Sequence, residues 1–295
     1  MIQLLLLVST LQAEQLDHDV DKSGPKWAFQ TRWEDGDGDK HKVQYKLPAD
    51  KVKQDLDVPL QFQPGPAYKD VAREVEAWGE GVKGAQASAK GSRRGVQISV
   101  SSQQGRKKMK QTLKQAAEVR DEAFEDALAE QGFTPLKGGV IPDHVKHVRL
   151  YSDDVQPLVK ALGGPTKDPR VFGDLALSYV QSIPYERSGR RRDKYRRPLS
   201  VLGRNKGDCD SKATLYLALM HQAYPELPLA IVYIEGHAFV ALGLDPSSGD
   251  TTIRDGGRRW VLAEPVGPAM TSIGEVARKS RRRVKTGRYT LRAVP

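Results

Sequence analysis

The strongest hydrophobic pattern in the chain follows Gly207, where apolar residues recur three and four positions apart. This spacing places them on one face of a helix and predicts that the helix packs against a core. Asp208 suits the N-cap, because its carboxylate can accept free N–H groups of the first turn. We therefore predict a buried helix that begins at Cys209 and has the face Cys209, Ala213, Tyr216, Leu217, Met220 and Tyr224.

Short apolar runs after this helix predict three strands. Residues 229–235 form the first run and residues 237–244 the second, with His237 at its first position. Residues 259–264 form the third and end at Glu264. If the second and third strands pair as an antiparallel hairpin, alternation places their inward residues on one face. The register that we predict pairs Leu244 with Gly257, Ala241 with Trp260, Phe239 with Leu262 and His237 with Glu264.

A second alternating pattern lies near the N-terminus. Residues 27–33 and 41–47 alternate apolar and polar side chains and are separated by Asp35-Gly36-Asp37-Gly38-Asp39. This pattern predicts two strands joined as a hairpin. The aspartates also have the spacing that opens a calcium loop, but Lys40 and Lys46 stand where such a loop needs glycine and a bidentate glutamate. We therefore predict a turn without a metal.

Helical spacing recurs at residues 71–82 and 106–131, with a short strand at 96–100 between them, and again at 153–162 and 168–182. No Gly-rich phosphate loop or internal repeat accompanies these elements. His144 and His147 are three residues apart but have only Asp143 nearby, which is weak support for zinc. The pattern predicts an α+β protein in which the cysteine helix packs on an antiparallel sheet, preceded by a smaller α+β domain.

The ends of these patterns predict the domain boundaries in a chain of 295 residues, which is long enough for two cores. Residues 1–13 are apolar but too short to span a membrane. They fit the core of a signal peptide that ends at Ala13, although no Lys or Arg precedes the run; the alternative is a first strand or helix. We therefore expect an exported protein, periplasmic or secreted, without a transmembrane helix. The predicted parts are a polar linker at 14–26, an N-terminal α+β domain of unknown role at 27–150, and a domain at 151–295 that holds the cysteine and a basic C-terminal tail.

Positive charge is concentrated in the second half of the chain. Residues 151–295 contain 24 Lys and Arg against 15 Asp and Glu, whereas the first 150 residues contain 23 against 22. Because one basic group immediately precedes the cysteine region, Arg190, Arg191 and Arg192 are candidate substrate-binding residues that would attract an anionic partner. A second group spans residues 278–288. Solvated loops are the alternative, and the absence of a recognition motif argues against nucleic acid.

Cys209 is the only cysteine, so the chain forms no internal disulfide and its thiol is available for chemistry. At a helix N-terminus the thiolate is stabilised by the helix dipole, and we expect its pKa to be lowered. His237 has the role of base, Glu264 orients it, and the main-chain N–H of Cys209 can donate to an oxyanion. The structural alternatives are a buried inert cysteine and an ordinary hydrogen-bonded histidine.

These motifs resemble the transglutaminase-like superfamily of papain-type cysteine enzymes, in particular its bacterial and archaeal members. The resemblance covers about residues 168–268 and rests on Gly-Asp-Cys opening an apolar helix, Gly-His opening a strand, and a strand that ends in an acidic residue. It implies a papain-like core with Cys209, His237 and Glu264 as the triad. Many members have aspartate at the third position, so the longer glutamate implies a small backbone offset. Gln181 and Tyr185 are candidate side-chain donors to the oxyanion.

The resemblance and the residues together predict acyl transfer on an amide bond through a cysteine thioester, in a peptide or protein substrate. We favour hydrolysis, by a peptidase or amidase, over transamidation, because nothing in the sequence excludes water from the cleft. No metal or organic cofactor is implied. Two alternatives remain: a non-catalytic binding module that keeps this fold, and a basic protein that binds an anionic surface or polymer such as the cell wall.

Overall fold

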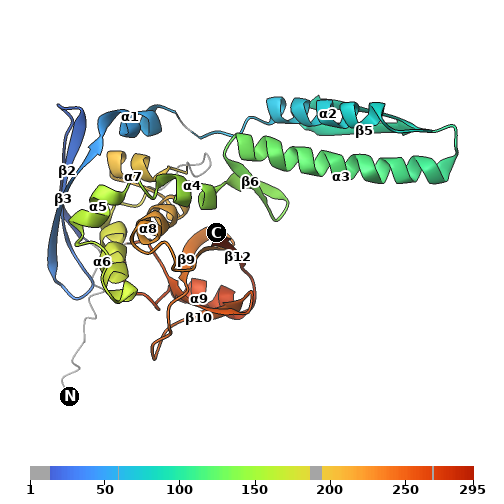
Figure 1. The fold of residues 1–295 in the computed structure, drawn as a ribbon. Coiled ribbons are helices and arrows are strands. Elements are labelled where there is room, and N and C mark those ends of the chain that lie inside the picture. The colour runs from blue at the N-terminus through green and yellow to red at the C-terminus, as the bar shows by residue number, and fades with distance from the viewer. Residues whose placement is uncertain (1–13, 59, 187–194, 268) are drawn as a thin grey trace, which may run out of the picture. The chain divides into compact units, whose positions relative to one another are not determined.

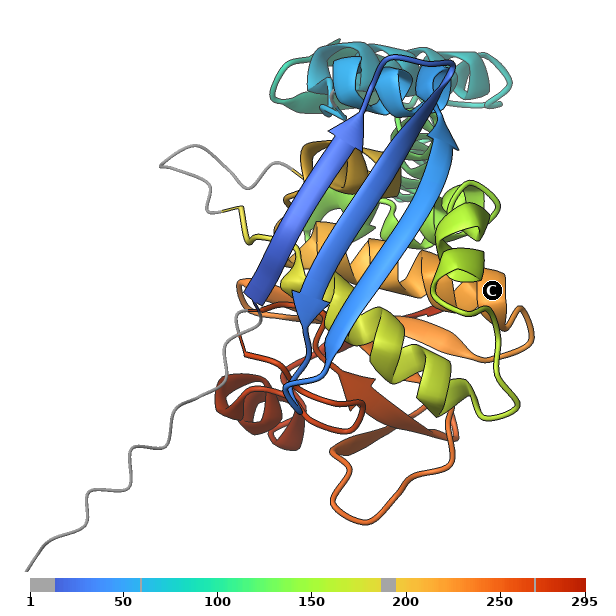
Figure 2. The same cartoon turned by 90° about the vertical axis from the view of Figure 1, so that its left-hand side faces the viewer.

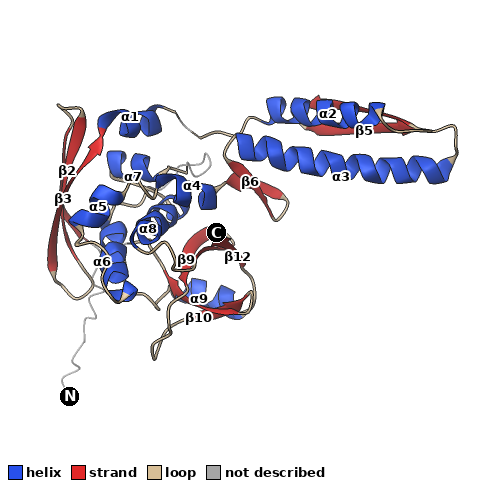
Figure 3. Cartoon of the chain, viewed as in Figure 1, coloured by secondary structure: helices blue, strands red, loops and turns tan. Residues whose placement is uncertain are grey.

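The computed structural model describes residues 14–58, 60–186, 195–267 and 269–295 (Figure 1). The chain divides into two compact units. The first unit comprises residues 1–59 and 144–295, and the second comprises residues 60–143. These boundaries differ from the expected division at residue 150, because the N-terminal strands belong to the unit that contains Cys209. Helices and antiparallel strands occur in both units (Figure 3), which confirms the predicted α+β class.

The N-terminal strands form a three-stranded antiparallel sheet of β1 (Glu14–Asp21), β2 (Lys26–Glu34) and β3 (Lys40–Pro48). The predicted hairpin of β2 and β3 is confirmed. Its turn is held by Asp35, whose Oδ1 accepts the N–H groups of Asp37 and Asp39 at 3.0 and 2.9 Å. The expected polar linker at 14–26 is wrong over most of its length. Polar side chains do not prevent β1 from forming there, because main-chain hydrogen bonds pair it with β2.

The three-stranded sheet packs on α6 (Pro169–Ser182) through aromatic side chains. Trp33 donates its indole N–H to Ser178 Oγ at 3.0 Å, and the hydroxyls of Tyr45 and Tyr179 lie 3.0 Å apart. All three aromatic side chains are buried. Figure 2 shows the strands lying across the helices of this unit. The sheet is therefore part of the core that supports the cysteine helix.

The cysteine helix, α8 (Cys209–Ala223), is the most deeply buried helix of the described residues. The sequence pattern predicted one buried face, but every residue from Ser211 to Met220 is buried. Other helices surround it, including α6, whose predicted position is confirmed. The remaining helices of this group are α1 (Ala49–Asp57), α4 (His144–Tyr151), α5 (Gln156–Ala161) and α7 (Pro198–Arg204).

A five-stranded antiparallel sheet packs against α8 and has the strand order β10-β11-β9-β8-β12. The three predicted strands are confirmed as β8 (Leu229–Ile234), β9 (His237–Leu242) and β11 (Arg258–Ala263). The sheet also contains β10 (Thr252–Asp255) and β12 (Thr290–Val294), which the sequence pattern did not predict.

The predicted register of β9 on β11 is wrong by two residues. Ala241 pairs with Leu262, where Trp260 was expected. The cause is β10, which the sequence pattern did not predict. The tight turn that we assigned to the connection between β9 and β11 instead connects β10 with β11. Gly256 and Gly257 have φ of +57° and +77° and join β10 to β11 as a two-residue hairpin. A shift of two residues keeps the same side chains on the same face.

The second unit is a small α+β arrangement. Its core is formed by Ala72, Val75, Ala89 and Ala116, where two helices pack on a hairpin. The predicted long helices and the strand between them are confirmed, whereas β4 was not predicted. The elements are α2 (Pro64–Glu80), β4 (Gln86–Ser92), β5 (Gly95–Ser101), α3 (Arg106–Glu130), β6 (Phe133–Leu136) and β7 (Gly139–Pro142).

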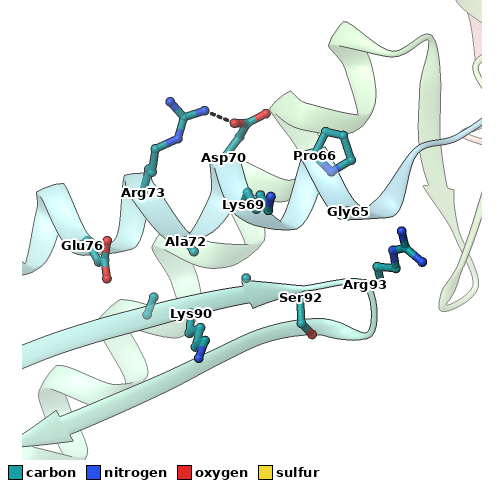
Figure 4. Close-up of a pocket in the computed structure, with 12 residues that line it drawn as sticks. Gly65, Pro66, Lys69, Asp70, Ala72, Arg73, Glu76, Lys90, Ser92 and Arg93 are labelled. Atoms are coloured by element: carbon teal, nitrogen blue, oxygen red, sulfur yellow. Dashed lines mark hydrogen bonds and ion pairs between the residues drawn. The ribbon is translucent and has the colours of Figure 1, made fainter.

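A shallow hollow in the second unit lies between α2 and β4 (Figure 4). Lys69 and Arg73 line it from the helix and Lys90 from the strand, and Arg73 forms an ion pair with Asp70. None of the described residues that line this hollow is a cysteine or histidine. The hollow therefore provides neither a thiol nor an imidazole for chemistry, and the candidate site is in the first unit.

Across the described part of the chain, no helix combines the length and the apolar character needed to cross a bilayer.

Candidate active site

Cys209 is the first residue of α8, as the sequence pattern predicted. Asp208 is the N-cap: its Oδ1 accepts the main-chain N–H of Ser211 at 3.0 Å and the Ser211 hydroxyl at 2.5 Å. The N–H of Lys212 donates to the Asp208 carbonyl at 3.0 Å. These bonds use the N–H groups of Ser211 and Lys212. The main-chain N–H of Cys209 takes part in neither bond and can donate to a substrate oxygen.

His237, at the start of β9, and Glu264, just after the end of β11, form a close pair. His237 Nε2 lies 2.5 Å from Glu264 Oε1, and Glu264 Oε2 accepts the main-chain N–H of Ala277 at 2.6 Å. If the observed register continues by one residue, Glu264 stands opposite Phe239 and diagonal to His237. A glutamate side chain is long enough to cover this diagonal. The backbone offset expected for a glutamate at this position stays a prediction.

The sulfur of Cys209 lies at the start of β9. It accepts the main-chain N–H of Ala238, the residue that follows His237. The thiol in turn donates to Asp210 Oδ1, with Sγ and the oxygen 3.2 Å apart. Cys209 and Glu264 are 9% and 7% exposed. The structure thus brings the three predicted triad residues, from α8, β9 and the end of β11, to one place.

The expected low pKa of the Cys209 thiol is wrong. Burial raises this pKa above its ordinary value, the negative charges of Asp210 and Asp208 raise it further, and the Ala238 N–H opposes them. The prediction considered only the helix dipole, whereas burial removes water from the thiolate and two carboxylates face it. Resting Cys209 is therefore a neutral thiol that needs a base to ionise.

Gln181 supports the carboxylate segment of the site. Its side-chain amide Nε2 donates to the main-chain carbonyl of Glu264 at 3.0 Å and to that of Thr271 at 2.9 Å. The residue is buried, so these bonds and not solvent satisfy its amide. To act as the predicted oxyanion donor, Gln181 would have to give up one of these two bonds, since an amide nitrogen carries two hydrogens.

Tyr185 lies beside the loop that precedes Cys209. Its main chain forms a parallel bridge with Gly207, whose N–H donates to Pro184 O at 3.3 Å and whose carbonyl accepts the N–H of Glu186 at 3.0 Å. Tyr185 is 41% exposed, and its predicted role as an oxyanion donor stays a prediction. The predicted substrate-binding residues Arg190, Arg191 and Arg192 lie outside the described residues.

A buried lysine connects α8 with the end of α6. Lys212 Nζ donates to the carbonyls of Gln181 and Ile183 at 3.1 and 2.7 Å, and burial lowers the pKa of Lys212 to about 7. These carbonyls lie at the C-terminal end of α6, where helix carbonyls lack partners of their own. Lys212 therefore holds the first turn of α8 against the segment that also carries Gln181. The hydrophobic pattern did not predict this role, although a lysine one turn beyond Cys209 in an apolar helix is a visible signal for it.

A second buried polar cluster, which the sequence pattern also did not predict, includes His144 and Tyr233 and lies near Asp210. His144 Nδ1 is 2.7 Å from the Tyr233 hydroxyl, and His144 Nε2 is 3.7 Å from Asp210 Oδ2. Burial lowers the pKa of His144 to about 3, so the imidazole is neutral at physiological pH. Among the described residues, no group of three or more His, Cys, Asp or Glu is arranged to hold a metal ion. His144 and His147 are both buried, and His147 Nδ1 lies 3.0 Å from the Tyr195 hydroxyl.

The second basic segment forms α9 (Arg278–Lys285), which adjoins the site. Ala277, just before the helix, and Ser280, within it, both donate to the Glu264 carboxylate. Ser280 and Val284 are buried and most of the basic side chains point outward. Arg281 and Lys285 of α9 line a hollow together with Arg254 of β10. The helix therefore carries a cationic surface next to the residue that binds His237.

Comparisons with protein-family models, with curated proteins and with solved structures found no match to this chain.

Proposed function

We propose that the first unit is a transglutaminase-like cysteine enzyme that transfers the acyl group of an amide through a thioester on Cys209. The observation that carries this proposal is the 2.5 Å contact between His237 and Glu264 beside a sulfur bound to the Ala238 N–H. A helix that starts with the nucleophile and packs on an antiparallel sheet supports a papain-like core. The intact set of three residues argues against a binding module that has lost the reaction.

The contact with Glu264 determines which nitrogen of His237 acts as the base. A carboxylate only accepts hydrogen bonds, so Nε2 carries the proton and Nδ1 has a lone pair. Nδ1 is also the ring nitrogen closer to the main chain, where the sulfur of Cys209 lies. Because the resting thiol is neutral, its proton has to pass to Nδ1 as the sulfur attacks.

The reaction then follows in two balanced steps. The sulfur of Cys209 bonds to the substrate carbonyl carbon while the thiol proton moves to His237, and the main-chain N–H of Cys209 stabilises the oxyanion. The C–N bond breaks as the imidazolium of His237 protonates the leaving amine. Water attacks the thioester, gives its proton to His237, and the acid leaves as the thiol is restored. An amine in place of water would give a new amide; we favour hydrolysis.

The proposal predicts that His237→Ala slows acylation of Cys209 by about 10²–10⁴-fold, the usual contribution of a positioned acid–base group. The probe is a peptide thiobenzyl ester, whose activated carbonyl needs little substrate recognition. Release of benzyl thiol gives the rate, and intact mass spectrometry gives the acyl-enzyme. His221→Ala, at the other end of α8, is the matched control and should retain the wild-type rate. Equal rates for His237→Ala and wild type would refute the proposal.

The outward cations of α9 favour a second candidate, binding to an anionic polymer or surface. Arg254, Arg281 and Lys285 face one hollow, which concentrates positive charge at one place. We expect Cys209→Ala protein to bind long-chain polyphosphate, with an affinity that falls steeply as salt rises. Replacing these three residues with glutamine should abolish most of that binding, whereas replacing Arg106, Lys107 and Lys108 of the second unit should not. If both triple variants bind equally, charge on α9 is only a solvated surface.

A further inference from the structure

We infer that the edge of β4 and the adjoining side of α2 form a docking site for a partner protein, whose acidic segment joins the β4–β5 hairpin as a third strand. This surface belongs to the second unit, to which the sequence pattern assigned no role. The inference does not depend on the activity proposed for Cys209, which lies in the first unit. It combines main-chain pairing at a sheet edge with attraction between charges.

A row of main-chain groups on β4 points away from β5. Ser92 pairs with Gly95 across a two-residue turn, so these two residues exchange both of their N–H···O=C bonds. Because the pattern alternates along the ladder, Lys90 also bonds to β5, whereas the N–H and C=O groups of Ala89 and Gly91 point outward. Within the part of the chain that the structure describes, β4 pairs with no strand other than β5. Ala89 and Gly91 therefore present the donors and acceptors that an added strand requires.

The hollow between α2 and β4 lies beside these main-chain groups (Figure 4). Residues 89–93 line it from the strand and its turn, and α2 lines it from the other side. Gly91 allows the two main chains to approach, because a Cβ atom there would overlap the carbonyl oxygen of Tyr68. Nearer the start of β4, a Cβ atom on Gly79 would lie 2.8 Å from the Ala87 carbonyl oxygen, so α2 covers the strand there. An added strand therefore has room along residues 89–93.

The charge around this hollow determines the chemistry of the partner. The charged residues that line it are Lys69, Asp70, Arg73, Glu76, Lys90 and Arg93. Arg73 is paired with Asp70, whereas Lys69, Lys90 and Arg93 are exposed and form no ion pair with any described residue. We call these three residues the edge cations. One lies on α2 and the others on β4 and its turn, so carboxylates on an added strand would be attracted from both sides.

The edge cations also argue against a second copy of this chain as the occupant. Two β4 edges paired with each other would bring the edge cations of both copies together, and positive charge at a strand edge is a common protection against such self-pairing. A polyphosphate or nucleic acid would be attracted by the cations but would leave the carbonyl groups of Ala89 and Gly91 without a donor. An acidic polypeptide in an extended conformation satisfies both the charges and the main chain.

Peptide binding to the full-length Cys209→Ala protein tests the inference while preventing any thiol-dependent cleavage of the probe. The probe is fluorescein-labelled Ser-Glu-Val-Glu-Thr-Glu-Val-Ser, and fluorescence anisotropy gives its affinity. Replacing its glutamates with glutamine should weaken binding at least about tenfold, since several exposed charge pairs are lost together. Replacing the three edge cations with glutamine should weaken binding of the acidic probe by a similar factor.

A matched control changes three exposed cations at the start of α3, Arg106, Lys107 and Lys110, to glutamine. These residues follow the end of β5, whereas the hollow lies at the turn between β4 and β5. The control alters the net charge of the protein by the same amount and should keep the affinity of the unaltered groove. Circular dichroism of both triple variants shows whether the fold is intact.

N-methylated probes test the main-chain pairing without any change in the protein. In an added strand only alternate residues direct their N–H groups toward β4. Methylating the nitrogens of one alternate set should weaken binding by more than about tenfold, as expected for the loss of two main-chain hydrogen bonds, and methylating the other set should leave it nearly unchanged. Amide exchange followed by NMR should slow at Ala89 and Gly91 when the unmodified probe binds.

Four results would overturn the inference. These are no binding of the acidic probe at millimolar concentration, equal binding of its glutamine counterpart, equal losses for both methylated sets, and unchanged exchange at Ala89 and Gly91. Long-chain polyphosphate that displaces the probe and loses the same affinity in the edge-cation variant would also overturn a peptide partner. Because every sample lacks the Cys209 thiol, none of these results bears on acyl transfer, which the His237→Ala experiment tests separately.

Discussion

Glu264→Gln is expected to slow acyl transfer by about 10⁴-fold while the protein stays folded. A glutamine in this position can accept the Ala277 N–H only through its oxygen, which turns its NH₂ group toward His237. Nε2 must then accept that hydrogen, so the ring proton moves to Nδ1. The base toward Cys209 is lost although every side chain keeps its place.

Rates of benzyl thiol release measure this effect, and thermal unfolding shows whether the fold is intact. Glu275→Gln is the matched control, because Glu275 is exposed on the same segment and accepts the Ser272 N–H. It should leave the rate unchanged. Near-normal turnover by Glu264→Gln would mean that the carboxylate serves packing of α9 and does not set the tautomer of His237.

Cutting the chain at two different places should have opposite effects on stability. A fragment of residues 151–295 is expected not to fold, because it lacks β1, β2, β3 and α4, including buried Trp33 and Tyr45. Loss of a single large buried aromatic side chain costs about 3–5 kcal/mol, and a domain is stable by only about 5–15 kcal/mol in total. Removal of residues 60–143 is instead expected to leave the first unit folded.

A Gly/Ser linker of about ten residues should suffice for that deletion. The deletion leaves two ends to be joined, one near Val58 and one near His147. Arg197 donates to the Val58 carbonyl and its charge also acts on His147, so both ends lie near the same residue. Circular dichroism and calorimetry should give a cooperative transition for the deletion protein and none for the 151–295 fragment. A folded fragment, or an unfolded deletion protein, would contradict the division into these two units.

Local signals in the sequence were sufficient for much of the site. Asp208 and the apolar repeat after it predicted where α8 begins, and the two-residue alternation of β9 and β11 placed His237 and Glu264 on one face. The register itself was wrong, but a shift of two residues keeps both side chains on the same face, where they are still in contact. The side-chain length of glutamate then covers the diagonal distance.

Features that depend on tertiary structure were not predictable in the same way. β1 has a polar sequence and forms because β2 offers it hydrogen bonds. The first unit is built from two segments that are distant in the sequence, and the second unit is inserted between them. The raised pKa of Cys209 depends on burial and on where Asp210 points. A helix start alone says nothing of either, which is why the dipole argument had the wrong sign.

The packing of Trp33 against Ser178 joins residues that are 145 positions apart in the chain. During synthesis, the apolar side of β2 and β3 therefore stays uncovered until α6 has been made, and the whole second unit is synthesised before α6. Contacts between such distant residues form slowly, since a long loop has to close first. The nascent chain thus exposes Phe29, Trp33 and Tyr45 for a long interval, which makes this hairpin the segment where chaperones would engage the protein and where aggregation would begin.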